Sequence, residues 1–167
     1  MENSRGFLNQ ICYRLPHSLQ IKCAERFDRR GEYFSVIIAD IDNFKKVNDT
    51  YGHAFGDEVI RQVGELFLKN AKKEGFCARY GGEEFAMILP HSNPVAVAEA
   101  IRTDFEALDF HTPEGIKHFT LSLGAAIYDK HYESGSLFFE EADNALYHAK
   151  RSGKNRVILS TTHTANE

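Results

Sequence analysis

The 167-residue sequence predicts an α+β (α/β) fold in which a mixed central β-sheet is flanked by helices. Short apolar runs, which are typical of buried strands, alternate along the chain with segments whose apolar residues recur at helical spacing. The alternation is broken once, where Gly81-Gly82 separates two apolar runs and predicts a tight β-hairpin in which both glycines adopt positive φ. A hairpin makes the sheet mixed, and the order strand-helix-strand-strand-helix-strand is that of a ferredoxin-like core.

Three segments divide the chain. Residues 1–30 are expected to form a helical lead-in, because apolar residues from Phe7 to Arg30 recur at helical spacing, with an interruption at Pro16. Residues 31–160 hold the sheet and its helices, and residues 161–167 are expected to be a flexible tail. The predicted strands are Tyr33 to Asp40, Phe76 to Tyr80, Glu84 to Leu89, Phe119 to Tyr128 and Arg156 to Leu159. The predicted helices are Asn43 to Thr50, Asp57 to Lys73, Pro94 to Leu108 and Ser136 to Arg151.

Composition and charge narrow the class of protein. Hydrophobic residues make up 43% of the chain and charged residues 26%, which is ordinary for one globular domain. The net charge of −4 argues against duplex nucleic acid or an anionic membrane as the main partner. No apolar run approaches the ~20 residues that a membrane span needs. The three cysteines are odd in number and follow no zinc pattern, so we expect reduced thiols in a cytoplasmic protein.

Two acidic clusters stand next to predicted strands. Asp40 ends the first buried strand, and Glu83 and Glu84 follow the two glycines of the hairpin. If the hairpin lies beside that strand, Asp40 and Glu83 come within reach of one cation. Mg²⁺ prefers one or two carboxylates, with its remaining ligands taken from water and substrate phosphates. The sequence therefore indicates a magnesium site, although a Gly-Gly hairpin alone is usually only a turn, and Asp42 could cap a helix.

Lysines and backbone N–H groups supply a matching positive region. Lys45 lies at the start of a short predicted helix, whose first N–H groups, from the pair Asn43-Phe44 onward, are free to receive phosphate oxygens. Lys150 and Lys154 follow the last long helix, and Gly153 is expected to be the C-cap that fixes the direction of their loop. Surface lysines are usually only solvated, but two carboxylates, Mg²⁺ and several lysines together indicate a triphosphate site.

The segment from Asn48 to Asp57 carries two glycines and predicts a loop between helices. In the simplest interpretation the loop only joins two helices, and Asp57 caps the second of them. In the functional interpretation this loop recognises a base. A carboxylate accepts hydrogen bonds from N1–H and N2–H₂ of guanine, and adenine lacks that pair of donors, so Asp57 would select guanine.

Together these residues resemble the signature of the GGDEF domains, the diguanylate cyclases. The first two blocks are Asp40-Ile41-Asp42-x-Phe44-Lys45-x-x-Asn48-Asp49-x-Tyr51-Gly52-His53-x-x-Gly56-Asp57 and Arg79-Tyr80-Gly81-Gly82-Glu83-Glu84-Phe85, the GGEEF variant. The later blocks are Leu121-Ser122-Leu123-Gly124 and Ala142-Asp143-x-Ala145-Leu146-Tyr147-x-Ala149-Lys150-x-x-Gly153-Lys154-Asn155. The resemblance covers roughly Tyr33 to Ile158 and implies a palm core related to that of the nucleotidyl cyclases.

The resemblance implies that two GTP molecules condense to cyclic di-GMP and release two pyrophosphates. Asp40 and Glu83 would hold Mg²⁺, with Mn²⁺ as an alternative metal, and the carbonyl oxygen of Ile41 would be a third ligand. Glu83 would also accept the 3′-OH proton, with Glu84 beside it, and Lys45 would stabilise charge in the transition state. Because one site holds one GTP, two subunits must face each other, and the active species is expected to be a homodimer.

The same resemblance implies a set of substrate-binding residues, in which the later lysines hold phosphates and three residues line the guanine pocket. The set is Asn43, Phe44, Lys45, Asn48, His53, Asp57, Lys150 and Lys154. Lys154 stands where an Arg is common, which keeps the charge but loses the bidentate fork.

Two further departures and two alternatives accompany this assignment. The stretch Glu2 to Gln10 keeps little of the family's usual opening segment, and a sensor or receiver domain is expected upstream. Lys72-Lys73-Glu74-Gly75 stands where many members carry Arg-x-x-Asp, so no high-affinity product-inhibition site is predicted.

The main alternative is a catalytically silent domain that binds GTP as a regulatory or interaction module, but such relatives lose a metal carboxylate or a glycine. A mixed GMP–AMP product is disfavoured by Asp57.

Overall fold

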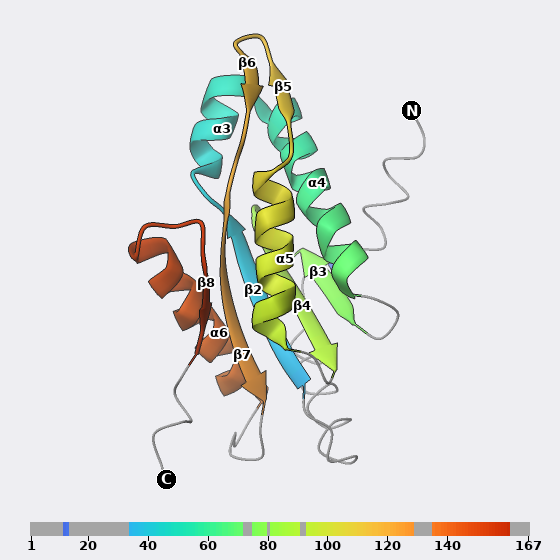
Figure 1. Ribbon diagram of the computed structural model, residues 1–167, viewed down its shortest axis with the longest axis vertical. Helices are drawn as coiled ribbons and strands as arrows, with labels where there is room; N and C mark the ends of the chain where they lie inside the picture. Colours follow the sequence, from blue (N-terminus) through green and yellow to red (C-terminus); the bar gives the residue numbers. More distant parts are fainter. Residues whose placement is uncertain are drawn as a thin grey trace.

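A computed structural model describes residues 12–13, 34–71, 75–79, 81–90, 93–128 and 135–160 of the protein (Figure 1). In this part of the chain a six-stranded sheet forms the centre, and a separate two-stranded hairpin projects at one end. The strands are β1 Cys12–Tyr13, β2 Phe34–Ile41, β3 Phe76–Arg79, β4 Glu84–Pro90, β5 Phe110–Thr112, β6 Gly115–Lys117, β7 Leu121–Tyr128 and β8 Val157–Leu159. The helices are α3 Phe44–Tyr51, α4 His53–Ala71, α5 Pro94–Glu106 and α6 Gly135–Arg151.

The central sheet has the strand order β1-β3-β4-β2-β7-β8 and is mixed, as the sequence predicts. β2 runs antiparallel to both of its neighbours, β4 and β7, whereas the outer pairs β1–β3 and β7–β8 are parallel. Its four inner strands, β3-β4-β2-β7, are joined by helices and the β3–β4 hairpin in the order of a ferredoxin-like core, so the predicted fold class is confirmed.

Helices cover both faces of the sheet, and the side chains of β2 alternate between them. Ile37, Ala39 and Ile41 belong to one buried cluster together with residues of α3, α4 and α5. Phe34, Val36 and Ile38 belong to a second cluster, which contains residues of α6. Successive side chains of a strand point to opposite faces, so Asp40, two residues after Ile38, points to the same face as Ile38. This is the face of the sheet that α6 covers.

Several element boundaries differ from the sequence predictions. The helical lead-in is wrong at Cys12–Tyr13, which pair with β3 as a short parallel strand, and the rest of residues 1–30 lies outside the described residues. Helix α4 begins at His53 rather than Asp57, and the β5–β6 hairpin was not expected. The predicted tail, residues 161–167, also lies outside the described part. Within that part, none of the helices combines the length and apolar character needed to cross a membrane.

Candidate active site

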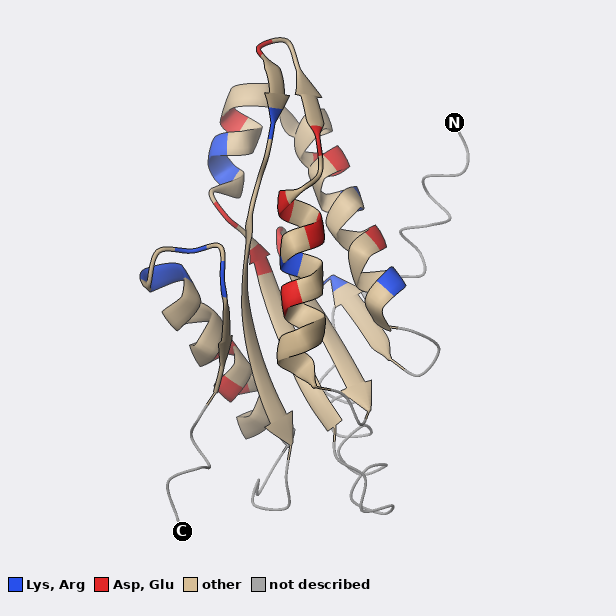
Figure 2. Ribbon diagram, in the orientation of Figure 1, with Lys and Arg blue, Asp and Glu red and all other residues tan. Residues whose placement is uncertain are grey.

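The β-sheet places two acidic side chains next to each other. In the register between β2 and β4, Asp40 lies directly opposite Glu84, and in the register between β2 and β7 it lies opposite Ser122. Residues directly opposite in adjacent strands direct their side chains to the same face, so both carboxylates face α6. From the last turn of α6, Lys150 reaches them and places its Nζ 2.7 Å from Oδ2 of Asp40. Figure 2 shows the same arrangement as an acidic patch at the end of β2 near the basic end of α6.

The turn before Glu84 holds Glu83 near the same strand end. The N–H of Ile41 donates to the carbonyl of Glu83 at 3.3 Å, and the guanidinium of Arg79 donates to the carbonyl of Gly82. The prediction that both turn glycines adopt positive φ is wrong, because four residues rather than two connect β3 to β4. The Glu84 carboxylate folds back over Gly81, where a Cβ would meet it, although this end of a flexible side chain can move aside.

Burial and mutual repulsion shift the acids of this cluster in the same direction. Burial raises the pKa of Asp40 above its usual value, even though the hydrogen bond and charge of Lys150 act to lower it. Burial and then the charge of Asp40 raise the pKa of Glu83 and, likewise, the pKa of Glu84. Three acids whose ionised forms are all disfavoured make a site that gains from a bound cation.

The donor set of this cluster fits Mg²⁺. Carboxylate oxygens of Asp40 and Glu83 are ligands that a hard cation prefers, and the hydrogen bond from Ile41 to Glu83 keeps the backbone of Ile41 beside them. Among the described residues, no group of three or more His, Cys, Asp or Glu side chains is placed to hold a metal unaided. Mg²⁺ usually completes its shell with water and substrate phosphates, so it needs only one or two carboxylates from the protein.

A second part of the site lies where α3 begins. Phe44 is buried in the core, and the first backbone bond of the helix runs from the Val47 N–H to the Asn43 carbonyl, so the preceding N–H groups lack intrahelical partners. Asn43 adopts a left-handed conformation with φ 57°, and its Oδ1 accepts a 2.5 Å hydrogen bond from Nζ of Lys154. Lys154 thus stands at the helix N-terminus, where anions bind.

The C-cap expected at Gly153 is confirmed. Gly153 has φ 112°, and the N–H of Lys154 donates to the carbonyl of Ala149 at 3.0 Å. A hydrogen bond from an N–H to the carbonyl five residues earlier, across a left-handed glycine, is the Schellman motif. This motif ends α6 and fixes the path of the following loop. Lys150 in the last turn and Lys154 in the loop are thereby directed to the same edge of the sheet, one at Asp40 and the other at Asn43.

The prediction of a loop from Asn48 to Asp57 is wrong, because Asn48 lies in α3, Asp57 lies in α4, and Gly52 alone separates the two helices. The Asn48 side chain occupies the space that a Cβ at Gly56 would fill, so this glycine allows Asn48 to pack against α4. Asp57 lies inside α4, which rules out its predicted role as a helix cap. The side chains of Lys45, His53 and Asp57 are exposed and make no hydrogen bond or ion pair with the residues that the structure describes. The structure therefore groups Asp40, Glu83, Glu84 and Lys150 directly, and Asn43 with Lys154.

The sequence analysis did not predict the hydrogen-bonding role of Asp42. This residue was considered as a helix cap, but α3 has Asn43 at its N-cap and no side-chain capping bond. Asp42 is buried, and its carboxylate instead accepts hydrogen bonds from the hydroxyls of Thr120 and Ser122 and from the Asn155 N–H. These partners lie 78 to 113 residues away in sequence, so no local pattern could have predicted the contact.

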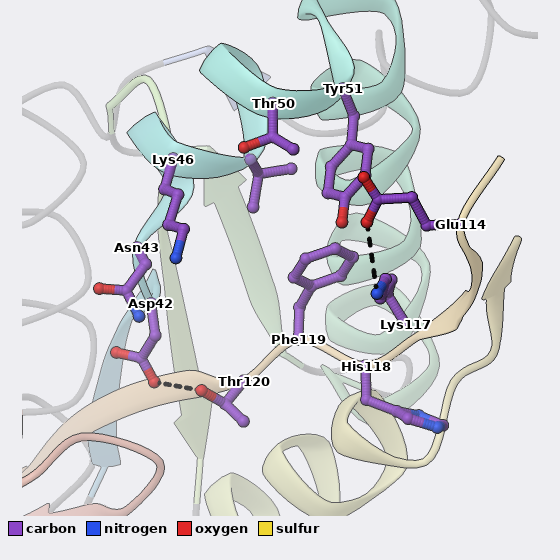
Figure 3. Close-up of a pocket in the computed structure, with 11 residues that line it drawn as sticks. Asp42, Asn43, Lys46, Thr50, Tyr51, Glu114, Lys117, His118, Phe119 and Thr120 are labelled. Carbon is purple, nitrogen blue, oxygen red and sulfur yellow. Dashed lines mark hydrogen bonds and ion pairs between the residues drawn. The ribbon is translucent and has the colours of Figure 1, made fainter. Parts of the chain in front are cut away.

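A pocket of about 430 Å³ lies beside this site rather than in it. Lys46, Thr50 and Tyr51 of α3 line one side, and the segment from β6 to β7 lines the other, with Asp42 at its edge (Figure 3). Asp40, Glu83 and Lys150 are not among its lining residues, although Asn43 is. The cavity is therefore distinct from the carboxylate cluster, and it shares with the site only the start of α3.

Comparison with known proteins gives a consistent result. The sequence model described as diguanylate cyclase, GGDEF domain, matches residues 8–156. Diguanylate cyclase A of Treponema denticola is 40% identical over 134 residues, which make up 78% of this chain and 36% of that protein. Diguanylate cyclase DosC of Escherichia coli is 40% identical over 136 residues, or 79% of this chain and 29% of that protein. The chain thus spans about a third of the length of these curated relatives.

Solved structures agree with the sequence relatives. The GGDEF domain of DgcB from Caulobacter crescentus, in complex with c-di-GMP, superimposes with a TM-score of 0.83 at 34% identity, covering 90% of this chain and 91% of that one. The active GGEEF domain of a diguanylate cyclase from Vibrio cholerae gives a TM-score of 0.83 at 32% identity, covering 90% of this chain and 97% of that one.

Proposed function

This chain belongs to the diguanylate cyclase GGDEF-domain family, and on that premise we propose that it condenses two GTP molecules to cyclic di-GMP and two pyrophosphates. The observation that supports the proposal most directly is the cluster of Asp40, Glu83 and Glu84 with Lys150 at 2.7 Å from Asp40. Silent relatives are expected to lose a metal carboxylate or a motif glycine, and this chain keeps both glycines and all three acids.

In the proposed site, Asp40, Glu83 and the carbonyl of Ile41 would hold Mg²⁺, or alternatively Mn²⁺. When bound with the nucleotide, the metal would neutralise phosphate charge. Lys150 and Lys154 hold the phosphates, together with the free N–H groups around Asn43 and Phe44. Two lysines at one edge of the sheet keep the triphosphate in position relative to the carboxylates, which is the main task of a phosphoryl-transfer site.

The bond-making step transfers a nucleotidyl group between two GTP molecules. The 3′-oxygen of one GTP forms a bond to the α-phosphorus of the other, the bond to the β-phosphate oxygen breaks, and pyrophosphate leaves. Glu83 accepts the 3′-OH proton, with Glu84 beside it. Lys45, exposed at the start of α3, stabilises the charge that builds up on the phosphate.

Base selection and assembly complete the proposal. Asn48, His53 and Asp57 line the guanine pocket, and the Asp57 carboxylate accepts from the donor pair that only guanine presents. Each subunit holds one GTP, so two copies face each other across a two-fold axis during the reaction. Because the curated relatives are roughly two to three times as long as this chain, we also propose that a sensor or receiver domain controls how often two copies meet.

The test is to incubate concentrated protein with GTP and Mg²⁺ and to separate the nucleotides by chromatography. Glu83→Ala tests the metal carboxylate, and Glu114→Ala, which removes an exposed acid on the β5–β6 hairpin, serves as the matched control. We expect cyclic di-GMP from the wild type and the control but not from Glu83→Ala. Below saturation of the dimer, the rate should rise with the square of the protein concentration. Retained GTP binding without product at any concentration would favour the silent binding module.

A further inference from the structure

The loop that carries Lys154 is held in a strained conformation. Gly153, Lys154 and Asn155 have consecutive positive φ angles of 112°, 64° and 46°. Left-handed backbone costs a lysine about 1 kcal/mol or more, whereas an asparagine adopts it more readily, so the conformation of Lys154 persists only where surrounding contacts enforce it. The strain therefore points to contacts that fix this loop, and these contacts converge on Asn155.

The backbone of Asn155 is tied to the end of β2. Its N–H donates to Oδ2 of Asp42 at 3.0 Å, and the same carboxylate accepts from Thr120 Oγ1 and Ser122 Oγ at 2.7 Å each. Figure 3 shows the bond between Asp42 and Thr120. Asp42 thus joins β2, the start of β7 and the loop after α6 at one buried point.

The side chain of Asn155 is tied to α5. Its Nδ2 donates to Glu106 at 2.8 Å, and its Oδ1 accepts from Arg102 at 2.8 Å. Arg102 is itself held by Glu99 and Glu106, one turn away on either side, and only 17% of its side chain is exposed. Asn155 is therefore fixed from two directions, through its backbone by Asp42 and through its side chain by the last turns of α5.

The residues next to this network carry the proposed phosphate contacts. Asn43 follows Asp42, Lys154 precedes Asn155, and these two neighbours are joined by the 2.5 Å bond from Lys154 Nζ to Asn43 Oδ1. We propose that Asp42, Asn155 and Arg102 are positioning residues, which set the Lys154 ammonium at the N-terminus of α3 and so contribute to nucleotide affinity through Lys154. This inference rests on the proposed function, because it assigns Lys154 to the phosphates of GTP.

Binding of a non-hydrolysable GTP analogue with Mg²⁺ tests the proposal by a double-mutant cycle. Asn155→Gly tolerates the left-handed backbone and keeps the N–H bond to Asp42, but removes both side-chain bonds to α5. We expect Asn155→Gly to weaken binding by roughly tenfold, or about 1.4 kcal/mol, in the wild-type background. In the Lys154→Ala background the same change should have almost no effect, because the residue through which Asn155 acts is already gone.

Arg102→Ala probes the network from outside the loop and has a close control. Arg61 on α4 likewise pairs with acids three residues before and four residues after it, Glu58 and Glu65, but its bonds in the described structure stay within its own helix. Arg102→Ala should weaken analogue binding severalfold, and only when Lys154 is present, whereas Arg61→Ala should leave it unchanged. If Arg102 only stabilised the fold, Arg102→Ala would instead lower the unfolding temperature and leave the affinity for the analogue unchanged.

The outcomes separate this inference from the proposed function. Equal losses of affinity from Asn155→Gly in the wild-type and Lys154→Ala backgrounds would overturn the positioning role while leaving the GTP site intact. Unchanged affinity in both Asn155→Gly and Arg102→Ala would do the same. If the wild-type protein binds no GTP analogue, the proposed function fails first, and the positioning role fails with it.

Discussion

Gly124 controls how closely α6 approaches the sheet. A Cβ at this position would meet three backbone atoms of α6, namely the Ala142 carbonyl oxygen, the Leu146 nitrogen and the Ala145 carbonyl carbon. The first two would lie nearly 1 Å inside the 3.0 Å that real Cβ contacts respect. Because all three atoms belong to the backbone, no change of rotamer can relieve the clash, and Gly124→Ala must move the helix itself.

The size of the effect follows from that displacement. For a Cβ to fit, α6 must withdraw from β7 by about 1 Å, and overpacking of this kind costs ~1–3 kcal/mol. For a chain of this size, each kcal/mol lowers the unfolding temperature by roughly 2–4 °C, so a decrease of about 2–12 °C is expected. Lys150 lies on the same helix, and its 2.7 Å bond to Asp40 should lengthen as α6 moves away.

Thermal unfolding of Gly124→Ala and Gly82→Ala, compared with the wild type, measures this effect. Gly82 is the matched stability control, because a Cβ there meets no atom within 4 Å and its φ is not in the left-handed region. Gly124→Ala should unfold several degrees below both the wild type and Gly82→Ala. Unfolding of Gly124→Ala within about 1 °C of the wild type would show that α6 is not held at its packing limit, and the reasoning would be refuted.

Three further predictions concern the site. Folding raises the pKa of Glu84, so the ionised carboxylate destabilises the metal-free protein at neutral pH. Glu84→Gln should therefore raise the unfolding temperature at pH 7.5. This gain in unfolding temperature should shrink as the pH falls toward 4.5, the ordinary pKa of a glutamate side chain. A constant gain across a pH series would contradict this. Asp57→Ser should relax the preference for GTP over ATP, measured by competition, and unchanged discrimination would remove Asp57 from the base pocket. Micromolar cyclic di-GMP should inhibit turnover little; full inhibition would contradict the absence of a site at residues 72–75.

The fold could be predicted because its signals are local. β2 and β4 are short apolar runs, α5 and α6 have helical spacing, and the structure contains all four close to their predicted bounds. The β5–β6 hairpin was missed because its strands have three residues each, too few for a periodic pattern. Its turn, with Pro113 followed by Glu114 and a left-handed Gly115, carries a recognisable turn signal that could have located it.

Glycines were the least predictable residues, because the same residue type serves different physical needs. Gly56 was assigned to a loop, but it lies inside α4, where the Asn48 side chain occupies the space of its missing Cβ. Gly81 was assigned a positive φ, but its φ is not in the left-handed region, and the Glu84 side chain folds over it. In both cases the surroundings of the glycine include a side chain whose approach a sequence pattern does not contain.

The bond between Lys150 and Asp40 bears on how one lysine could serve the proposed metal site. An ammonium group has three donors, and in this structure one of them lies 2.7 Å from a carboxylate whose burial already disfavours its charge. A divalent cation arriving with the nucleotide would satisfy Asp40 more strongly than one hydrogen bond does. Lys150, held at the end of α6 by the Schellman motif, would then need only a side-chain movement to reach the phosphates. If the proposed roles hold, the chain keeps its phosphate-binding lysine beside the metal-binding carboxylate before the nucleotide binds.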